Sequence, residues 1–200
     1  LSKIFGKKII IKLTSFGHDD PESIQRNSKI LFSLYQWADA YIGVSPVFED
    51  SYSKLDLEMS NYYPITNGVD TELFSPIKNL TEKKLLRSKL GLPIDKDLIL
   101  FVGHFSEEKS AIDLLNAWLI LQQKKTTASS GIVFIGSTDT NTFEVENNVV
   151  KNIKSKSEKF LNTQVFFIEK TNNIYQYYQA SDIFVLPSKR EGMPNSLLEA

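Results

Sequence analysis

Short apolar runs alternate with segments of helical spacing along almost the whole chain. The runs are rich in β-branched and aromatic residues and cover 8–13, 40–44, 62–65, 98–103, 131–136, 164–168 and 182–186. Helical spacing covers 22–38, 46–57, 81–90, 110–123, 142–161 and 173–180. Because the runs are apolar on both faces, the strands suit a parallel sheet that helices cover on two sides. The sequence therefore predicts an α/β fold.

Two local features of the helices can be predicted in more detail. In the segment 22–38, a stripe of apolar side chains is expected to face the core, and it consists of Ile24, Ile30, Leu31, Leu34 and Trp37. At the start of the helix near residue 110, Ser110 and Asp113 have the spacing of a capping box. These features predict which face one helix buries and where another begins.

Charge and hydropathy exclude some classes of partner. The formal net charge of −1 over 200 residues gives no support for binding nucleic acid or an anionic membrane through bulk charge. No apolar run approaches the roughly 18 residues that a bilayer-spanning helix needs. We therefore predict no nucleic-acid partner and no spanning helix.

The residues suited to metal binding are few. The absence of cysteine excludes disulfides, thiolate zinc sites and cysteine nucleophiles, and it is compatible with the cytosol. The two histidines, His18 and His104, are too few for a histidine-rich metal site, although His18 adjoins Asp19 and Asp20. A helix-capping role explains that acidic pair better than a metal site does. We predict no metal ion and no cofactor.

A dip in apolar composition over 67–97 predicts a boundary between two domains. We place the C-terminal part of a first domain at 1–68, a hinge with a lead-in helix at 69–97, and the N-terminal part of a second domain at 98–200. Leu1 lies almost within a strand pattern, and Ala200 lies shortly after the start of a helix. These positions predict an interior fragment in which both domains are incomplete.

The segment from Glu191 to Ala200 contains the most specific functional signal. Glu191 and Glu199 lie eight positions apart, and between them a glycine-containing turn leads into a helix that Pro194 begins. The preceding strand, the small-residue loop and the helix N-terminus form a place where backbone N–H groups can meet an anion. A carboxylate on each side suits a ligand with hydroxyls as well as phosphates, which points to a nucleotide-sugar. The alternative is an exposed loop acid beside an ordinary helical glutamate.

A second candidate segment, Gly103–Lys109, follows an apolar run and precedes a helix, where parallel sheets bind ligands. It has neither the Walker A pattern nor G-x-G-x-x-G, so it is not a standard phosphate loop. Lys109 could neutralise a diphosphate, or it could be a solvated surface lysine. Arg190 could pair with Glu191 or orient a ligand.

Four motifs follow one another along the chain. They are Asn67-Gly68-Val69-Asp70-Thr71-Glu72-Leu73-Phe74-Ser75-Pro76, Phe101-Val102-Gly103 with Lys109, Ser181-Asp182 through Pro187-Ser188, and Glu191 to Glu199. In this order and spacing they resemble the retaining GT-B glycosyltransferases, in particular the large family 4, or group 1, glycosyltransferases. The resemblance spans roughly 8–200, nearly the whole chain.

The resemblance implies two Rossmann-like domains that face each other across a cleft, the first for the acceptor and the second for the donor. It implies transfer of a sugar from a nucleoside diphosphate sugar, in most cases a UDP- or GDP-sugar, to a glycan, lipid or small-molecule acceptor with retention of configuration. Glu191 would lie near the transferred sugar as the catalytic residue, Glu199 would bind the ribose, and Lys109 would contact the diphosphate. The other donor-binding candidates are Gly103, His104, Arg190, Gly192, Met193 and Asn195.

The chain departs from the family pattern at His104, where an arginine is common. A neutral imidazole supplies one donor but no permanent charge, so Arg190 or a segment outside the chain would have to compensate. Two alternatives stay open, a sugar epimerase with the same donor and a non-catalytic nucleotide-sugar-binding protein. The resemblance implies a cytoplasmic carbohydrate-biosynthesis enzyme, and it allows peripheral contact with the inner face of the cytoplasmic membrane through a region before Leu1.

Overall fold

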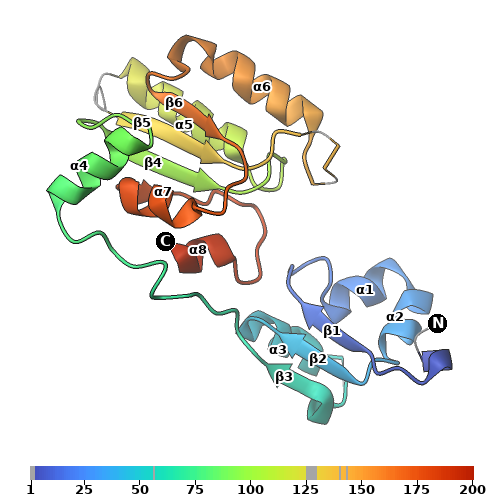
Figure 1. Cartoon of the computed structure of the whole chain (residues 1–200). Coiled ribbons are helices and arrows are strands. Elements are labelled where there is room, and N and C mark those ends of the chain that lie inside the picture. The colour runs from blue at the N-terminus through green and yellow to red at the C-terminus, as the bar shows by residue number, and fades with distance from the viewer. Residues whose placement is uncertain (1–2, 56, 125–129, 140, 143) are drawn as a thin grey trace. The chain divides into compact units, whose positions relative to one another are not determined.

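The computed structural model describes residues 3–55, 57–124, 130–139, 141–142 and 144–200 (Figure 1). Contacts between residues divide the chain into two compact units. Unit 1 consists of Leu1–Gly68 with Arg190–Asn195, and unit 2 consists of Val69–Lys189 with Ser196–Ala200. The chain therefore leaves unit 2 after Lys189 and returns to it at Ser196.

Unit 1 contains a three-stranded parallel sheet in the order β1-β2-β3. Its elements are η1 (Lys3–Phe5), β1 (Ile10–Leu13), α1 (Pro21–Asn27), α2 (Lys29–Tyr35), β2 (Ala40–Gly43), α3 (Pro46–Ser53), η2 (Met59–Asn61) and β3 (Tyr62–Pro64). The three strands confirm the runs predicted at 8–13, 40–44 and 62–65. The helix predicted over 46–57 is α3, and Asp56 lies outside the described residues.

Tyrosine rings form much of the core of unit 1. Tyr35, Tyr41, Tyr52 and Tyr62 lie in a row, and successive ring centroids are 4.9, 5.0 and 5.0 Å apart. All four side chains are buried, and the Tyr41 hydroxyl donates a hydrogen bond to the Tyr35 carbonyl. Burial, with a smaller contribution from Tyr52, raises the pKa of Tyr41 to about 12. The rings therefore act as neutral packing groups that hold α2 and α3 on the sheet.

The single helix predicted over 22–38 is wrong, because the chain breaks at Ser28. Ser28 has an extended backbone (φ −161°, ψ 117°), and its hydroxyl accepts a hydrogen bond from Leu31 N, which caps α2. Asp20 caps α1 in the same way by accepting from Ser23 N at 3.0 Å. The capping interpretation of the acidic pair beside His18 is thereby confirmed for Asp20.

The break at Ser28 also changes which face of the second helix is buried. Tyr35 faces the core, and Ile24 of α1 packs against it as predicted. The rest of the predicted stripe is exposed by 76, 57, 50 and 60% at Ile30, Leu31, Leu34 and Trp37. The prediction fails for these four because an interrupted helix does not keep the rotation of a continuous one.

Unit 2 contains a four-stranded parallel sheet in the order β6-β5-β4-β7. Its elements are α4 (Leu80–Lys89), β4 (Asp97–Val102), α5 (Ala111–Gln123), β5 (Ser130–Ile135), α6 (Asn147–Ser157), η3 (Glu158–Phe160), β6 (Val165–Ile168), α7 (Ile174–Ala180), β7 (Ile183–Phe184) and α8 (Asn195–Glu199). The strands confirm the four predicted runs from residue 98 onward. The helix predicted over 142–161 is α6 with η3, and Phe143 lies outside the described residues.

Helices cover both faces of the unit 2 sheet (Figure 1). Alternate strand residues point to opposite sides. On one side, α5 and α6 pack against Phe101, Ile132, Phe134 and Val165. On the other side, α4 and α7 pack against Leu98, Leu100, Val133 and Ile135. This two-sided core confirms the predicted α/β fold with parallel strands.

An ion pair joins α4 to the start of β7. The Arg87 guanidinium, whose side chain is 6% exposed, donates to the Asp182 carboxylate and to the carbonyl of Ala180. Lys83 donates to the other Asp182 oxygen at 2.6 Å. Burial alone would raise the pKa of Asp182, but hydrogen bonds from Lys83, Leu98 N and Arg87 outweigh it and lower that pKa. Asp182 therefore stays ionised and ties the lead-in helix to the sheet.

Two absences hold for the part of the chain that the structure describes. None of its helices combines the length and apolar character that crossing a bilayer requires. None of its His, Asp or Glu side chains gather in a group of three or more that could hold a metal ion.

Candidate functional site

The strand order of unit 2 creates a topological switch point between β4 and β7. From β4 the chain moves to β5 and then β6 on one side, and it then crosses to β7 on the other side of β4. Loops that leave the carboxyl ends of the two strands at such a point diverge, and ligands bind in the crevice between them. The loop after β4 is Gly103–Lys109, and the loop after β7 begins at Val185 and passes through Pro187. Both were predicted from sequence as parts of the ligand site.

The structure brings these two loops into direct contact. The backbone N–H of Lys189 donates a hydrogen bond to the carbonyl of Glu108 at 2.9 Å. Next to the paired strand ends, Val185 N donates to Leu100 O, also at 2.9 Å. Glu108, the residue before Lys109, is therefore hydrogen-bonded to the loop that leads to Arg190.

At the carboxyl edge of the sheet, the backbones of two glycines pack closely against each other. A Cβ on Gly136 would lie 2.1 Å from the carbonyl oxygen of Gly103, so no larger residue fits there without displacing the backbone. Gly103 N in turn donates to Ile135 O at 3.0 Å, which extends the β4–β5 pairing past the strand end. Gly136 is a site-shaping residue that the sequence analysis missed, although its position directly after an apolar run was a usable signal.

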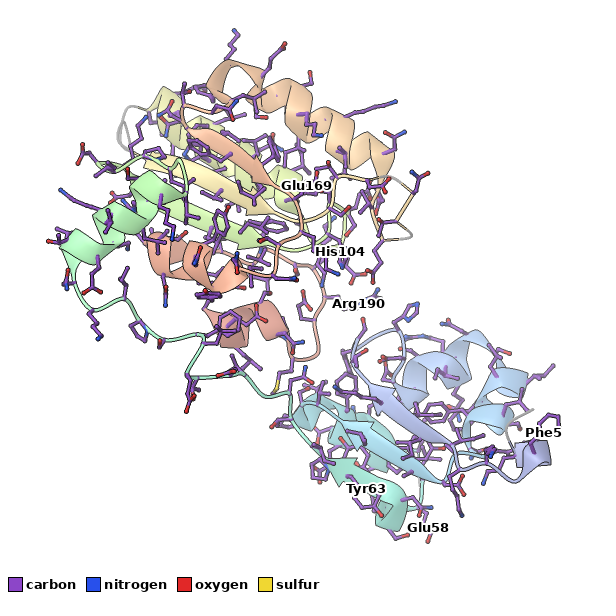
Figure 2. The ribbon with its side chains drawn as sticks, in the orientation of Figure 1. Phe5, Glu58, Tyr63, His104, Glu169 and Arg190 are labelled. Carbon is purple, nitrogen blue, oxygen red and sulfur yellow. The ribbon has the colours of Figure 1, made fainter. Side chains whose placement is uncertain are left out.

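His104 is paired with an acidic residue from a distant loop. Its Nε2 lies 2.9 Å from Glu144 Oε2, and both side chains are partly exposed, by 43 and 62%. Figure 2 shows His104 after β4 and Glu169 after β6. Glu169 accepts a hydrogen bond from Thr138 N at 3.2 Å. No sequence motif marked Glu144, because it lies in an irregular segment.

Lys109 lies at the junction of its loop with α5, but the predicted capping box is wrong. Ser110 has a left-handed backbone (φ 55°), and its hydroxyl donates to the Glu107 carbonyl at 3.2 Å instead of capping the helix. Asp113 N donates to the Ser110 carbonyl at 3.0 Å. The left-handed turn directs the serine side chain back into the loop. The first N–H groups of a 13-residue helix thus lie just after Lys109.

Glu199 lies on α8 and lines a pocket of about 320 Å³ in unit 2. The Tyr178 hydroxyl lies 3.0 Å from Glu199 Oε2 and 3.0 Å from the carbonyl of Ser196, so its one proton lies within reach of both acceptors. Phe74 and Gln179 also line the pocket. Sequence analysis identified Glu199 but not Tyr178, because two residues 21 positions apart give no local pattern.

The segment Arg190–Asn195 packs within unit 1. The Asn67 side-chain amide donates to the Met193 carbonyl at 2.8 Å, and Met193 packs against the unit 1 core. A Cβ on Gly192 would lie 2.2 Å from the Thr14 carbonyl oxygen, which leaves no space for a side chain. Asn67, which the sequence analysis named only within a family motif, is therefore a residue that holds this segment in place.

The predicted site residues thus form two sets, each within one unit. Unit 2 holds Gly103, His104, Lys109 and Glu199. Unit 1 holds Arg190, Glu191, Gly192, Met193 and Asn195. Each set is anchored by hydrogen bonds or close backbone packing to its own unit.

Comparison with known proteins identifies the family. Residues 82–200 match the family described as glycosyl transferases group 1. An Escherichia coli UDP-Gal:alpha-D-GlcNAc-diphosphoundecaprenol alpha-1,3-galactosyltransferase is 30% identical over 68% of this chain and 33% of its own length. A Campylobacter jejuni N,N'-diacetylbacillosaminyl-diphospho-undecaprenol alpha-1,3-N-acetylgalactosaminyltransferase is 29% identical over 86% of this chain and 43% of its own length.

A solved structure shows the same fold. The crystal structure of Anabaena Alr3699/HepE in complex with UDP-glucose superposes with a TM-score of 0.70 at 20% identity, over 94% of this chain and 48% of that one. The chain thus spans less than half the length of these relatives, and its fold is that of a GT-B fragment with Rossmann-like parallel sheets. Because the family match covers residues 82–200, more than half of the chain, this protein belongs to the group 1 glycosyl transferase family.

Proposed function

We propose that the intact protein is a retaining glycosyltransferase that moves a sugar from a nucleoside diphosphate sugar to an acceptor. The observation that carries the proposal is the switch point between β4 and β7, where the Lys189 N–H donates to the Glu108 carbonyl. The carboxyl edge of a parallel sheet at such a switch point is where α/β folds hold nucleotides. Here the two loops are also those that carry Lys109 and lead to Glu191.

Each residue has a distinct role in the proposed reaction. Lys109 and the N–H groups at the start of α5 would stabilise the diphosphate, whose charge grows as it leaves the sugar. Glu199 would accept hydrogen bonds from the ribose hydroxyls. Glu191 would lie beside the transferred sugar, and backbone groups of Gly192, Met193 and Asn195 would contact sugar and phosphate.

Retention follows, in this proposal, from attack on the same face that the diphosphate leaves. A diphosphate oxygen then takes the proton of the acceptor hydroxyl, so no side-chain nucleophile is needed. The protein's main contribution is preorganised charge around the leaving group, which costs no reorganisation when the bond breaks.

We assign the proposed domain functions to consecutive ranges of the sequence. Residues 1–68 would belong to an acceptor domain, 69–97 to a hinge with α4 as its lead-in helix, and 98–200 to a donor domain. The Lys83 and Arg87 bonds of α4 to Asp182 support a rigid lead-in helix, because they fasten α4 to the donor-side sheet.

The relatives favour particular substrates. Their names are those of glycosyltransferases, which favours transfer over the epimerase and the non-catalytic binding protein that the sequence left open. One is named for UDP-galactose, and the solved neighbour holds UDP-glucose, so a UDP-sugar is the donor to test first. Both named acceptors are linked to undecaprenol diphosphate, which supports a lipid-linked acceptor and a position at the inner face of the cytoplasmic membrane.

Replacement of Glu199 by alanine tests the donor site. We expect the dissociation constant for UDP to rise about tenfold, because two ribose hydroxyls lose a charged acceptor. Calorimetric titration of the intact protein with UDP and with an analogue lacking both ribose hydroxyls measures the effect. The analogue should bind wild type and variant alike.

The matched control is Glu72→Ala, which removes an exposed glutamate of the same unit. It should leave UDP binding unchanged. Failure of the wild-type protein to bind UDP, GDP or their sugars would contradict the proposed function.

A further inference from the structure

We infer that Tyr178 is a positioning residue that orients the Glu199 carboxylate toward the ribose of the donor. The inference rests on the proposed function and adds to it a residue on a different helix. Tyr178 lies on α7, whereas Glu199 lies on α8. Their side chains meet at 3.0 Å, between the phenol oxygen and Glu199 Oε2.

Packing contacts hold the ring of Tyr178 in place, separately from the contacts that its hydroxyl makes. Phe74 meets it edge to face with ring centroids 5.7 Å apart, and the Phe184 ring of β7 packs against it at a tilt, with centroids 5.6 Å apart. Aromatic pairs in this distance range favour defined relative orientations. The hydroxyl therefore points in a direction that the core of unit 2 determines.

The hydroxyl contacts both the backbone and the functional side chain of α8. It lies 3.0 Å from the Ser196 carbonyl and 3.0 Å from Glu199 Oε2. One contact sets the position of the helix, and the other limits rotation of the glutamate. A five-residue helix needs such an anchor, because short helices have little stability of their own.

The Tyr178 phenol stays protonated, so it can remain the donor in its hydrogen bond to Glu199. Burial raises the pKa of Tyr178, and the negative charge of Glu199 raises it further. The phenol thus keeps its proton at the pH of any enzyme assay and donates to the carboxylate. Because this bond engages Oε2, Oε1 is the oxygen that we assign to the ribose hydroxyls.

Without this hydroxyl, the Glu199 side chain would regain rotational freedom and lose a charge-assisted hydrogen bond. Binding a ribose would then have to fix the carboxylate as well as the ligand. We expect Tyr178→Phe to weaken UDP binding about fivefold. The donor KM should rise by a similar factor with kcat nearly unchanged, because the ribose is remote from the reacting bond.

The test compares Tyr178→Phe with Tyr177→Phe in the intact protein by UDP titration, donor kinetics and thermal unfolding. Tyr177 is a matched control because it lies on the same helix and packs in the same core. Phenylalanine keeps the ring contacts of Tyr178, so the variant should unfold within a few degrees of wild type. Tyr177→Phe should bind UDP as wild type does.

Two further measurements separate positioning from a general loss of structure. The analogue lacking both ribose hydroxyls should bind Tyr178→Phe and wild type equally. Adding Tyr178→Phe to Glu199→Ala should cause no further loss, because the two residues act as one unit.

Equal UDP binding by wild type and Tyr178→Phe would overturn the inference while leaving the donor site intact. An equal loss for UDP and for the analogue would overturn it too, since the residue would then act on overall structure. Absence of UDP binding by wild type would instead overturn the proposed function, and the inference with it.

Discussion

Replacing Gly192 with alanine is expected to lower the turnover of the intact enzyme about 100-fold. The added Cβ would lie 2.2 Å from the Thr14 carbonyl oxygen and 3.0 Å from a ring carbon of Phe48. The Thr14 backbone and the buried Phe48 ring cannot shift far enough to relieve these contacts. The segment that carries Glu191 must therefore move. A misplacement of about 1 Å near the reacting centre costs on the order of 100-fold in rate.

Steady-state kinetics on this variant measure the effect. Glu191→Gln should lower kcat to a similar extent with little change in UDP binding, because Glu199 is untouched. Gly192→Ala should also weaken UDP binding, because the displaced backbone is proposed to contact the phosphate. Gly68→Ala is the matched control, since a Cβ there would meet nothing within 4 Å and its φ is not in the left-handed region. Wild-type turnover in Gly192→Ala would contradict the placement of this segment in the site.

Replacing Arg87 with methionine is expected to lower the free energy of unfolding by about 3 kcal/mol. Arg87 is 5% exposed and donates hydrogen bonds to Asp182 and to backbone carbonyls of Ala180 and Lys96. Methionine fills most of the volume but removes one donor from the carboxylate, which keeps Lys83 and Leu98 N, and removes the guanidinium from the two carbonyls. Chemical denaturation at neutral pH measures the change.

The matched control is Lys84→Met on the same helix, where the exposed Lys84–Asp95 pair at 3.8 Å should contribute less than about 1 kcal/mol. The pH dependence supplies a second check. The pKa of Asp182 is lowered in the folded state, so its stabilising contribution is present above the unfolded value and is lost as pH falls through the folded value. The gap between Arg87→Met and wild type should therefore narrow in acid, and a constant gap would contradict the ion-pair explanation.

Local patterns predicted the elements of the fold well and their boundaries less well. Each strand that the structure describes overlaps a predicted apolar run, because the apolar residues of a strand are contiguous in the sequence. Two of them, β4 and β5, begin one residue earlier than predicted, at Asp97 and Ser130. The prediction of one continuous helix over 22–38 was wrong at Ser28, because the sequence does not distinguish a serine that caps a helix from a serine within one. The predicted capping box at Ser110 was wrong for a related reason, because the left-handed backbone of Ser110 depends on the loop around it.

The site residues divide in the same way. Glu191, Glu199 and Lys109 were predicted from motifs, because each lies at a recognisable strand–loop–helix junction. Tyr178, Asn67 and Gly136 were not found as site residues. Their importance comes from a hydrogen bond or a close approach to a residue far away in the chain.

The sequence by itself determined the α/β class, the parallel strands and the family motifs, because these depend on periodicity and on residues close together in the chain. Only the tertiary structure decided the strand order β6-β5-β4-β7, which sets Gly103–Lys109 beside the loop that follows β7. It also decided that Tyr178 reaches Glu199 and that Gly192 packs on Thr14. Such contacts follow from how whole helices and strands pack, and that packing minimises the free energy of the entire unit rather than of any local segment.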